Sequence, residues 1–363
     1  MLVPVNLGFA QASSDFLIAA LLIYSLAVLA FAGDYAFGRP RRSAAAKAAA
    51  PAVAQLATVG AGAAGAGPLA ESAEPGEPAE SAVPAVVPAG GGAGTLPAPR
   101  TGAFQSMWEA GPWVRIAVTL SALGMLAHLT AVICRGLAVH RAPWGNMYEF
   151  IVALTCVAAI FFGYIVVRYR AWALGVFVMG TVVIALGLAE ALINTPAGPL
   201  VPALQSYWLS IHVTAMTLAT GIFFVAAVLG ILYLVAERYR KRIAEGKIKP
   251  GNGLIERIPS AAQLDKLTYR TVVFGFPVWT FGVMAGAIWA DQAWGRYWGW
   301  DPVETWAFVT WVIYAAYLHA RATAGWRGAR AHYIQLLAFA TLMINIFVIQ
   351  IFITGMHSYA GVS

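Results

Sequence analysis

The sequence has few charged side chains and only two cysteines. Charged residues make up 11% of its 363 residues, whereas soluble domains average about 25%, so an ordinary soluble domain is excluded. Cys134 and Cys156 lie within apolar runs and form no CxxC motif, which excludes a disulfide framework and a four-thiolate metal site. We interpret both as buried small hydrophobic residues, so any thiol chemistry must use thiols from a partner.

The segment from Met1 to Ser14 contains no Lys or Arg. A secretory signal peptide begins with a positively charged region, so this segment does not have the features of one. We therefore expect the first apolar run to be retained as a membrane span. Hydrophobic residues form 60% of the chain, and several runs reach the ~20 residues that a spanning helix needs. Because helices satisfy their own backbone in lipid, the sequence predicts an all-α polytopic membrane protein. About eight transmembrane helices are expected, at 16–37, 113–138, 149–167, 171–190, 210–236, 271–290, 303–320 and 333–354.

Lysine and arginine set the expected orientation of these spans. With the N-terminus placed outside, all but three of the 23 Lys and Arg residues fall on the inner side, as the positive-inside rule requires. The exceptions are Arg135, Arg141 and Arg296. We therefore expect the N-terminus and the C-terminus both to be extracytoplasmic. The net charge of +7 then reflects topology and contact with membrane lipid, and it needs no nucleic acid.

A long stretch between the first two apolar runs is rich in Ala, Gly and Pro and has few residues able to form a core. Such a composition predicts disorder. We divide the chain into an N-terminal transmembrane helix at 1–38, a disordered cytoplasmic linker at 39–107 and a seven-helix domain at 108–363. The basic loop near 237–270 is expected to hold a short helix around Ala261 to Leu267.

An aromatic stretch joins the sixth and seventh expected spans, with the sequence Trp294-Gly295-Arg296-Tyr297-Trp298-Gly299-Trp300-Asp301-Pro302-Val303-Glu304-Thr305-Trp306. Flat rings in a glycine-containing loop suit a large planar ligand, and they equally suit an interfacial aromatic belt. His212, at the outer start of the fifth span, and His357, just past the outer end of the eighth, fall on the same side. Two imidazoles beside aromatic rings can ligate a haem iron. Two ordinary interfacial histidines are the alternative, and zinc lacks an evident third ligand.

Several nearby residues have both a local and a functional interpretation. Asp301, Pro302 and Glu304 make a capping-box-like start for the seventh helix. That start can coexist with a site, because it fixes where the aromatic loop leaves the helix. Arg296 can pair with a haem propionate or with a lipid headgroup. In the turn at 143–149, we interpret Asn146 and Glu149 as caps of the third span.

The remaining histidines are placed by the same topology. His319 lies near the inner end of the seventh span, where it can hold a second haem or make a helix–helix or headgroup contact. His128 lies midway along the second span, as a ligand or, in the interpretation we favour, as a hydrogen-bond donor between helices. His140 and His332 sit beside basic residues and are interpreted as ordinary interface residues.

The stretch from Trp294 to Trp306 resembles the tryptophan-rich WWD signature of haem-handling proteins. The further motifs are Trp208-Leu209-Ser210-Ile211-His212-Val213, Tyr317-Leu318-His319, Gly355-Met356-His357-Ser358-Tyr359-Ala360 and the turn at 143–149. Together they resemble the CcsA/ResC family of System II cytochrome c biogenesis. The resemblance covers about 108–363, as a haem-handling domain with its WWD loop at 291–306, and residues 1–107 carry none of the signature.

The resemblance implies a cofactor and the residues that hold it. The cofactor would be haem b (iron protoporphyrin IX), with its iron ligated on the outer face by His212 and His357. His319 would ligate a haem held within the membrane. The other expected cofactor-binding residues are Trp294, Arg296, Trp298, Trp300 and Asp301. No residue looks like a dedicated acid or base, so we expect positioning of the haem to be the main contribution of the chain.

The resemblance also implies an activity and partners. The chain would move or receive haem across the membrane and present it for thioether attachment to the CxxCH segment of apocytochrome c. It would act as a holocytochrome c synthase (haem lyase) component with a ResB-type partner subunit. The expected location is the bacterial cytoplasmic membrane, with the plastid thylakoid as the alternative. Other interpretations are a haem conduit or chaperone without synthase activity, a b-type haem quinone-linked electron carrier, and a scaffold without a cofactor.

Overall fold

Helices make up all the regular secondary structure in the part of the chain that the structure describes. The computed structural model describes residues 4–37, 107–199, 204–249, 254–323 and 325–357, which belong to one folded unit. Residues 39–106 of the predicted linker lie outside these ranges. The prediction of an all-α polytopic protein is confirmed.

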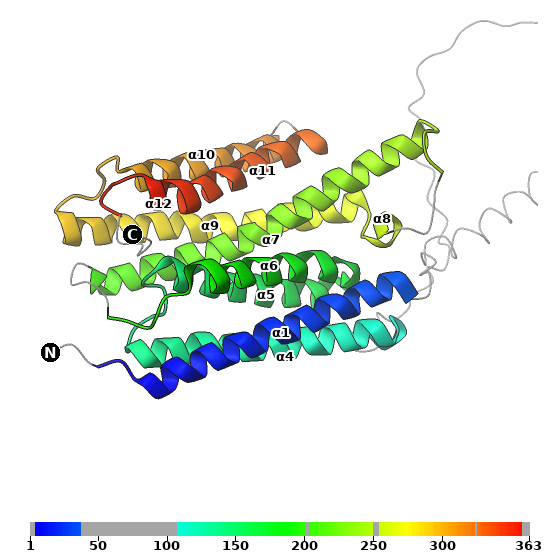
Figure 1. Ribbon diagram of the computed structural model, residues 1–363. Helices are drawn as coiled ribbons and strands as arrows, with labels where there is room; N and C mark the ends of the chain where they lie inside the picture. The colour runs from blue at the N-terminus through cyan, green and yellow to red at the C-terminus, as the bar shows by residue number, and fades with distance from the viewer. Residues whose placement is uncertain (1–3, 38–106, 200–203, 250–253, 324, 358–363) are drawn as a thin grey trace, which may run out of the picture. The chain divides into compact units, whose positions relative to one another are not determined.

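From residue 112 onward, most of the long helices follow one another with short connections (Figure 1). Their bounds are α1 Leu7–Phe37, α4 Pro112–Val139, α5 Met147–Tyr169, α6 Gly175–Ile193, α7 Tyr207–Ala244, α9 Ala261–Trp294, α10 Pro302–Thr323 and α11 Ala329–Ile344. The short elements are the 3₁₀ turn η1 Trp172–Leu174, the helix α8 Leu254–Arg257, the π-helical segment η3 Asn345–Ile349 and the helix α12 Gln350–Phe352. Each expected span therefore corresponds to one long helix, the eighth being α11 continued through η3 and α12.

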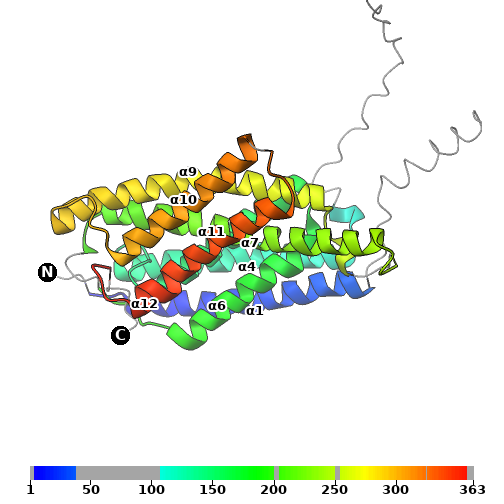
Figure 2. The same ribbon diagram turned by 90° about the horizontal axis from the view of Figure 1, so that it is seen from above.

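Successive long helices run in alternate directions, so the turns gather at two ends (Figures 1 and 2). We call one the aromatic end, made of residues 140–146, 194–199, 295–301 and 353–357. The other is the basic end, made of residues 170–171, 245–249, 258–260 and 325–328. The start of α1 lies at the aromatic end, because the N–H of Asn6 donates to the C=O of Ala138 at 2.9 Å. The opposite end of the same pair is closed by Phe37, which stacks on Trp113.

Seven of the described helices are long and apolar enough to cross a membrane. They are α1, α4, α5, α6 with η1, α7, α9 and α11 with its continuation. The eighth expected span, α10, is not among the seven, because its tryptophans, tyrosines and polar residues lower its mean hydropathy. It still has 22 residues, packs against α9 and α11, and runs from the aromatic end to the basic end.

Three helices are much longer than the apolar runs predict, and the first of them, α1, has 31 residues because it begins before its run. α7 has 38 residues and α9 has 34, and both extend past their apolar parts at the basic end. The expected separate helix at Ala261–Leu267 is instead the first two turns of α9. A capping box starts this helix, in which Ser260 and Gln263 bond each other's backbone N–H groups. Apolar runs miss such turns because their outward side chains are polar.

The pairing of α1 with α4 depends on close approach of the two backbones. Gly124 of α4 lies under the ring of Tyr24, so a Cβ built at Gly124 would come within 2.5 Å of that ring. Tyr24 is completely buried. Small residues allow such contact, which is a main source of helix association in lipid, where there is little hydrophobic driving force. Beyond this pair, one buried cluster joins α1, α4, α5 and α6 to α7 and to the start of α9, and a second joins α7, α9, α10 and α11.

Replacing Gly124 by alanine is predicted to destabilise the protein by roughly 1–3 kcal/mol, the usual cost of overpacking. The matched control is Gly180→Ala in α6, where a Cβ would meet nothing within 4 Å. That change replaces a helical glycine in open space and should stabilise by up to ~1 kcal/mol. Thermal unfolding of the purified protein in detergent measures both. Equal shifts for the two variants would contradict the close-packing argument.

Candidate functional site

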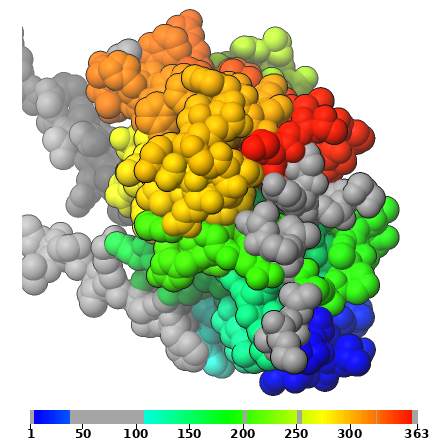
Figure 3. Space-filling model, turned by 90° about the vertical axis from the view of Figure 1, so that its left-hand side faces the viewer, coloured from blue at the N-terminus to red at the C-terminus, as the bar shows by residue number. Residues whose placement is uncertain are grey.

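A cavity of about 210 Å³ opens among the helices at the aromatic end. Its walls come from the turn at 141–147, the first turns of α7, the last turns of α9, the aromatic loop, the start of α10 and the end of the chain. Figure 3 looks onto this end, where the atoms of the α9–α10 turn lie beside those of the last described residues. The lining side chains that the following argument uses are His212, Trp289, Trp294, Trp298 and His357.

His212 is held in a fixed orientation by α9. Its Nδ1 lies 2.7 Å from the carbonyl oxygen of Gly282, and since a carbonyl only accepts, Nδ1 carries the proton. Gly286, one turn later, packs against the imidazole, and a Cβ there would come within 2.6 Å of the ring. Trp289 lies nearly parallel to the same ring, with centroids 6.4 Å apart. The ring's Nε2 has no hydrogen-bond partner among the described residues.

His357 is held in the same manner by a carboxylate. Its Nδ1 lies 2.9 Å from Oδ2 of Asp301, so Nδ1 is again the donor and Nε2 is again left without a partner in the described ranges. Oδ1 of Asp301 accepts the backbone N–H of Met356 at 2.6 Å. Gly355 allows this close approach, because a Cβ would lie 2.5 Å from Oδ1. Trp294 meets the His357 ring edge-on, with centroids 5.2 Å apart.

Asp301 is almost completely buried, with 6% of its surface exposed. Burial alone would raise its pKa, but the hydrogen bonds from His357 and from the N–H of Met356 outweigh burial and hold the pKa below its ordinary value. The carboxylate is therefore ionised at neutral pH. An ionised carboxylate on Nδ1 fixes the tautomer of His357 and the orientation of its ring.

The same residues start α10, as the sequence predicts. Oδ2 of Asp301 accepts the N–H of Val303 at 3.2 Å. The Glu304 carboxylate in turn accepts the backbone N–H of Asp301 at 3.2 Å and that of Gly299 at 2.9 Å. The helix start and the site thus share one carboxylate, and Glu304 closes the aromatic loop onto the first turn of α10.

These two imidazoles have the arrangement that metal-ligating histidines show. A ligating histidine usually donates its other ring N–H to a carbonyl or a carboxylate, which orients the free nitrogen. His212 does this with a carbonyl and His357 with a carboxylate, and Trp289 contacts both rings. The described residues contain no group of three His, Cys, Asp or Glu side chains that could hold a metal ion. Two imidazoles oriented in this way are a donor set that can ligate a haem iron.

The other expected site residues lie in different places. Trp294 and Trp298 line the cavity. Trp300 does not line it; its ring is 66% exposed, its backbone has a φ of 57°, and it meets Trp298 edge-on. Arg296 is exposed, with its guanidinium against Gly299. His319 is exposed near the basic end of α10, far along the helix from the cavity.

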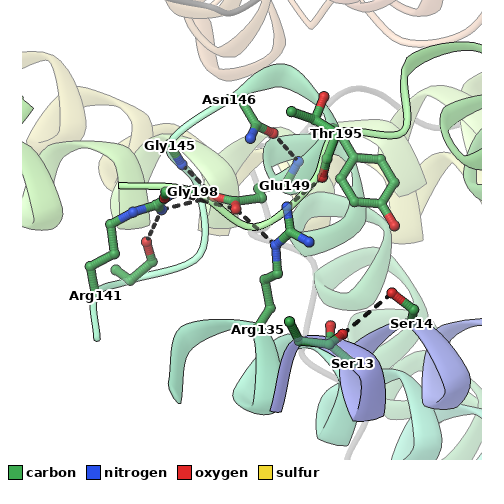
Figure 4. Close-up of polar contacts among 12 residues, drawn as sticks. Ser13, Ser14, Arg135, Arg141, Gly145, Asn146, Glu149, Thr195 and Gly198 are labelled. Carbon is green, nitrogen blue, oxygen red and sulfur yellow. Dashed lines mark hydrogen bonds and ion pairs between the residues drawn. The ribbon is translucent and has the colours of Figure 1, made fainter. Parts of the chain in front are cut away.

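The turn at 143–149 is held by a buried carboxylate (Figure 4). Glu149 accepts from Arg135 at 2.9 Å, from Arg141 at 2.8 Å and from the N–H of Gly145 at 2.8 Å. The side chain of Asn146 caps α5, as expected, by accepting the N–H of Glu149. The sequence predicts a capping role for Glu149 and misses its ion pairs, although two of the three outer arginines, Arg135 and Arg141, are its partners.

Two histidines outside the cavity are completely buried. Nε2 of His128 lies 3.0 Å from the carbonyl of Val152, so it donates between α4 and α5, as the favoured interpretation predicts. His332 was expected at the interface, and that expectation is wrong. Its ring is 0% exposed, stacks on Tyr233 and donates from Nε2 to Asp265 at 3.0 Å. The neighbouring basic residues gave no signal of this, because the partner carboxylate lies on a different helix.

Comparisons with known proteins agree with this architecture. The family described as "Cytochrome C assembly protein" matches residues 144–357. Proteins named "Cytochrome c biogenesis protein CcsA" are similar to the chain. The one from Heterosigma akashiwo is 35% identical over 245 residues (60% of this chain, 76% of that one), and the one from Guillardia theta is 37% identical over 234 residues, with the same coverage. The one from Gloeobacter violaceus is 32% identical over 297 residues (67% and 86%).

A solved structure titled "Cytochrome c Heme Lyase CcmF" superposes with a TM-score of 0.49 and 19% identity, over 68% of this chain and 43% of that chain. The family match covers the cavity, both of its histidines and the aromatic loop. Seven apolar helices and the CcsA relatives identify an integral membrane protein. The chain therefore belongs to the cytochrome c assembly protein family, in its CcsA type, and has a role in cytochrome c maturation.

Proposed function

We propose that this chain holds haem b with its iron between His212 and His357 and presents the ring for attachment to apocytochrome c. The observation that carries the proposal is the anchoring of both imidazoles through Nδ1, to Gly282 and to Asp301. Nε2 of each ring is therefore unprotonated, and its lone pair is held in a fixed direction at the same cavity. The haem supplies the iron and the vinyl groups to which the two cysteine thiols of a CxxCH segment add.

The task of the chain at this site is positioning. The indole rings of Trp294 and Trp298 form apolar walls on which a porphyrin can pack. The α10 cap fixes the aromatic loop, and the Asp301 carboxylate fixes His357 relative to that loop. Groups held in this way reduce the freedom that a reactant must lose before reaction. We assign no residue as an acid or base for thioether formation, and we infer that the chain acts as a template.

The proposal includes a membrane and partners. We place the protein in the bacterial cytoplasmic membrane, with the aromatic end outside, where apocytochrome c would meet the haem. The chain would be the haem lyase component of a complex with a ResB-type subunit. His319 stands on an exposed face of α10, so a second haem there would need its opposing ligand from outside this chain. That arrangement supports a partner helix packed along α10.

A His212→Ala, His357→Ala double variant is predicted to lose haem from this site, because both side chains that would hold the iron are removed. The reduced absorption spectrum of the complex purified with its partner measures this, and added imidazole should restore the signal by filling the vacated ligand positions. His140→Ala is the control, since His140 is exposed and outside the cavity lining. Unchanged haem content in the double variant would reject the ligand assignment.

Reconstitution with an apocytochrome then separates a synthase, which yields a thioether product, from a conduit.

An Asp301→Asn variant tests the anchoring of His357. The amide can still accept a hydrogen bond but carries no charge, so haem affinity is predicted to fall by about 10–100-fold, the usual effect of losing such a partner. Haem titration of the purified complex measures the affinity. Asp291→Asn, in the last turns of α9 at the same end, is the matched control and should leave the affinity unchanged. Equal affinities for the wild type and Asp301→Asn would contradict the role of the carboxylate.

The same carboxylate predicts a pH dependence of stability. The pKa of Asp301 is held below its ordinary value by hydrogen bonds that exist only in the folded protein. Its contribution to stability is therefore complete above the unfolded-state pKa of about 3.9 and is lost as pH falls through the lower folded-state pKa. The difference in unfolding midpoint between wild type and Asp301→Asn should be large at pH 7 and should shrink below pH ~4. A difference that is constant with pH would oppose this assignment.

A further inference from the structure

A column of buried polar side chains runs between α10 and α11, away from the haem-binding proposal. On α11 and η3 these residues are His332, Gln335, Thr341 and Asn345, and on α10 they are Tyr317, Tyr314 and Thr310. All are between 0% and 6% exposed. From His332 to Asn345 the column spans about 20 Å along the helix axis, at 1.5 Å per residue, which is most of the way between the two ends.

Many polar atoms in this column have no protein partner. They are Nδ1 of His332, both polar atoms of the Gln335 side chain, the hydroxyls of Tyr314 and Tyr317, and Oδ1 of Asn345. Native proteins satisfy nearly all buried polar atoms, and an unsatisfied one inside a membrane helix bundle costs several kcal/mol. Such atoms usually hydrogen-bond to internal water, which typically makes about three bonds to otherwise unpaired groups.

The column begins near the surface of the basic end, where Asp265 pairs with His332. Asp265 of α9 accepts from Nε2 of His332 at 3.0 Å and from both terminal nitrogens of Arg321, at 2.7 and 3.0 Å. The Asp265 side chain is 19% exposed, whereas that of His332 is 0% exposed. A group that reaches solvent is thus bonded to a buried imidazole that can exchange a proton at its other nitrogen. Tyr233, stacked on that imidazole, covers it from α7.

The next groups follow one another along α10 and α11 toward the aromatic end. Gln335 lies one turn after His332 on α11, and the hydroxyl of Tyr314 on α10 faces it. Thr310 follows Tyr314 by one turn, about 6 Å along the axis, and its Oγ1 lies 3.1 Å from that of Thr341. These groups can therefore form one hydrogen-bonded series if waters fill the intervals between them.

The column ends at the cavity. Asn345 lines the cavity, and its Nδ2 donates to the carbonyl of Val303 at 3.2 Å. Glu304, which also lines the cavity, follows Val303 directly and presents a carboxylate there. Asn345 is the first residue of the π-helical segment η3, a distortion that often occurs at functional positions.

We propose that this column is a water-filled path that carries protons between the Asp265–His332 pair at the basic end and Glu304 in the cavity. Each step passes one proton along a hydrogen bond between water, imidazole, amide, hydroxyl and carboxylate groups, and no electron moves. The inference does not depend on what the cavity binds. It gives a buried site a supply of protons from the opposite side of the membrane.

The water in the path can be detected by hydroxyl-radical footprinting of the purified full-length protein, since ordered water forms radicals beside buried side chains. Tyr314, Tyr317 and His332 should be oxidised despite their burial. Met179 is the control, because it is a reactive side chain with 0% exposure in the apolar core around α6. Protection of Tyr314 and Tyr317 equal to that of Met179 would overturn the proposal.

Proton movement is tested with the protein in vesicles that contain a pH-sensitive dye, under a potassium diffusion potential. We expect proton uptake above that of protein-free vesicles, and its loss in Gln335→Leu, which removes the two polar atoms that bridge His332 and Tyr314. This variant should fold, because leucine is of similar size and Gln335 has no protein hydrogen bond of normal geometry to lose. Thr268→Val, at a buried threonine satisfied by the carbonyl of Leu264, is the control and should keep the uptake. Equal uptake by the wild type and Gln335→Leu would overturn the proposal.

Discussion

The Asp301 carboxylate is the interaction on which the rest of the site depends. One oxygen accepts the N–H of Met356, and the other accepts from both Val303 and His357. Through this group the start of α10, the aromatic loop and the end of the chain become one rigid assembly. Its partners lie as many as 56 positions away from it in sequence, so a single ion sets the geometry of segments that are far apart along the chain.

The sequence contains most of the fold because each long apolar run has only one stable state in lipid. Length and hydropathy therefore suffice for the helices, and the distribution of Lys and Arg suffices to bring His212 and His357 to one end. The end of α7 and the start of α9 are not predictable in this way, since these turns expose polar residues, and the start of α9 is fixed by its capping box.

The contacts within the site are less predictable than the topology. A sequence shows that Asp301 can cap a helix, but the same carboxylate also orients His357, and only the folded chain brings these two together. The burial of His332 against Asp265 and the pairing of Glu149 with Arg135 have the same cause. Each joins different helices, and no local pattern specifies the partner. Trp300 illustrates the converse, because its ring belongs to the aromatic motif yet faces away from the cavity.

The length of α7 has a consequence for the surface of the membrane. Its 38 residues extend roughly 57 Å at 1.5 Å per residue, almost twice the ~30 Å thickness of the hydrocarbon layer. The helix begins at the aromatic end, so its last turns extend beyond the headgroups of the opposite side. Lys241 and Arg242 lie in the last turn of this extension. A macromolecule that approaches from that side would contact this helical extension before it reached the helices within the membrane.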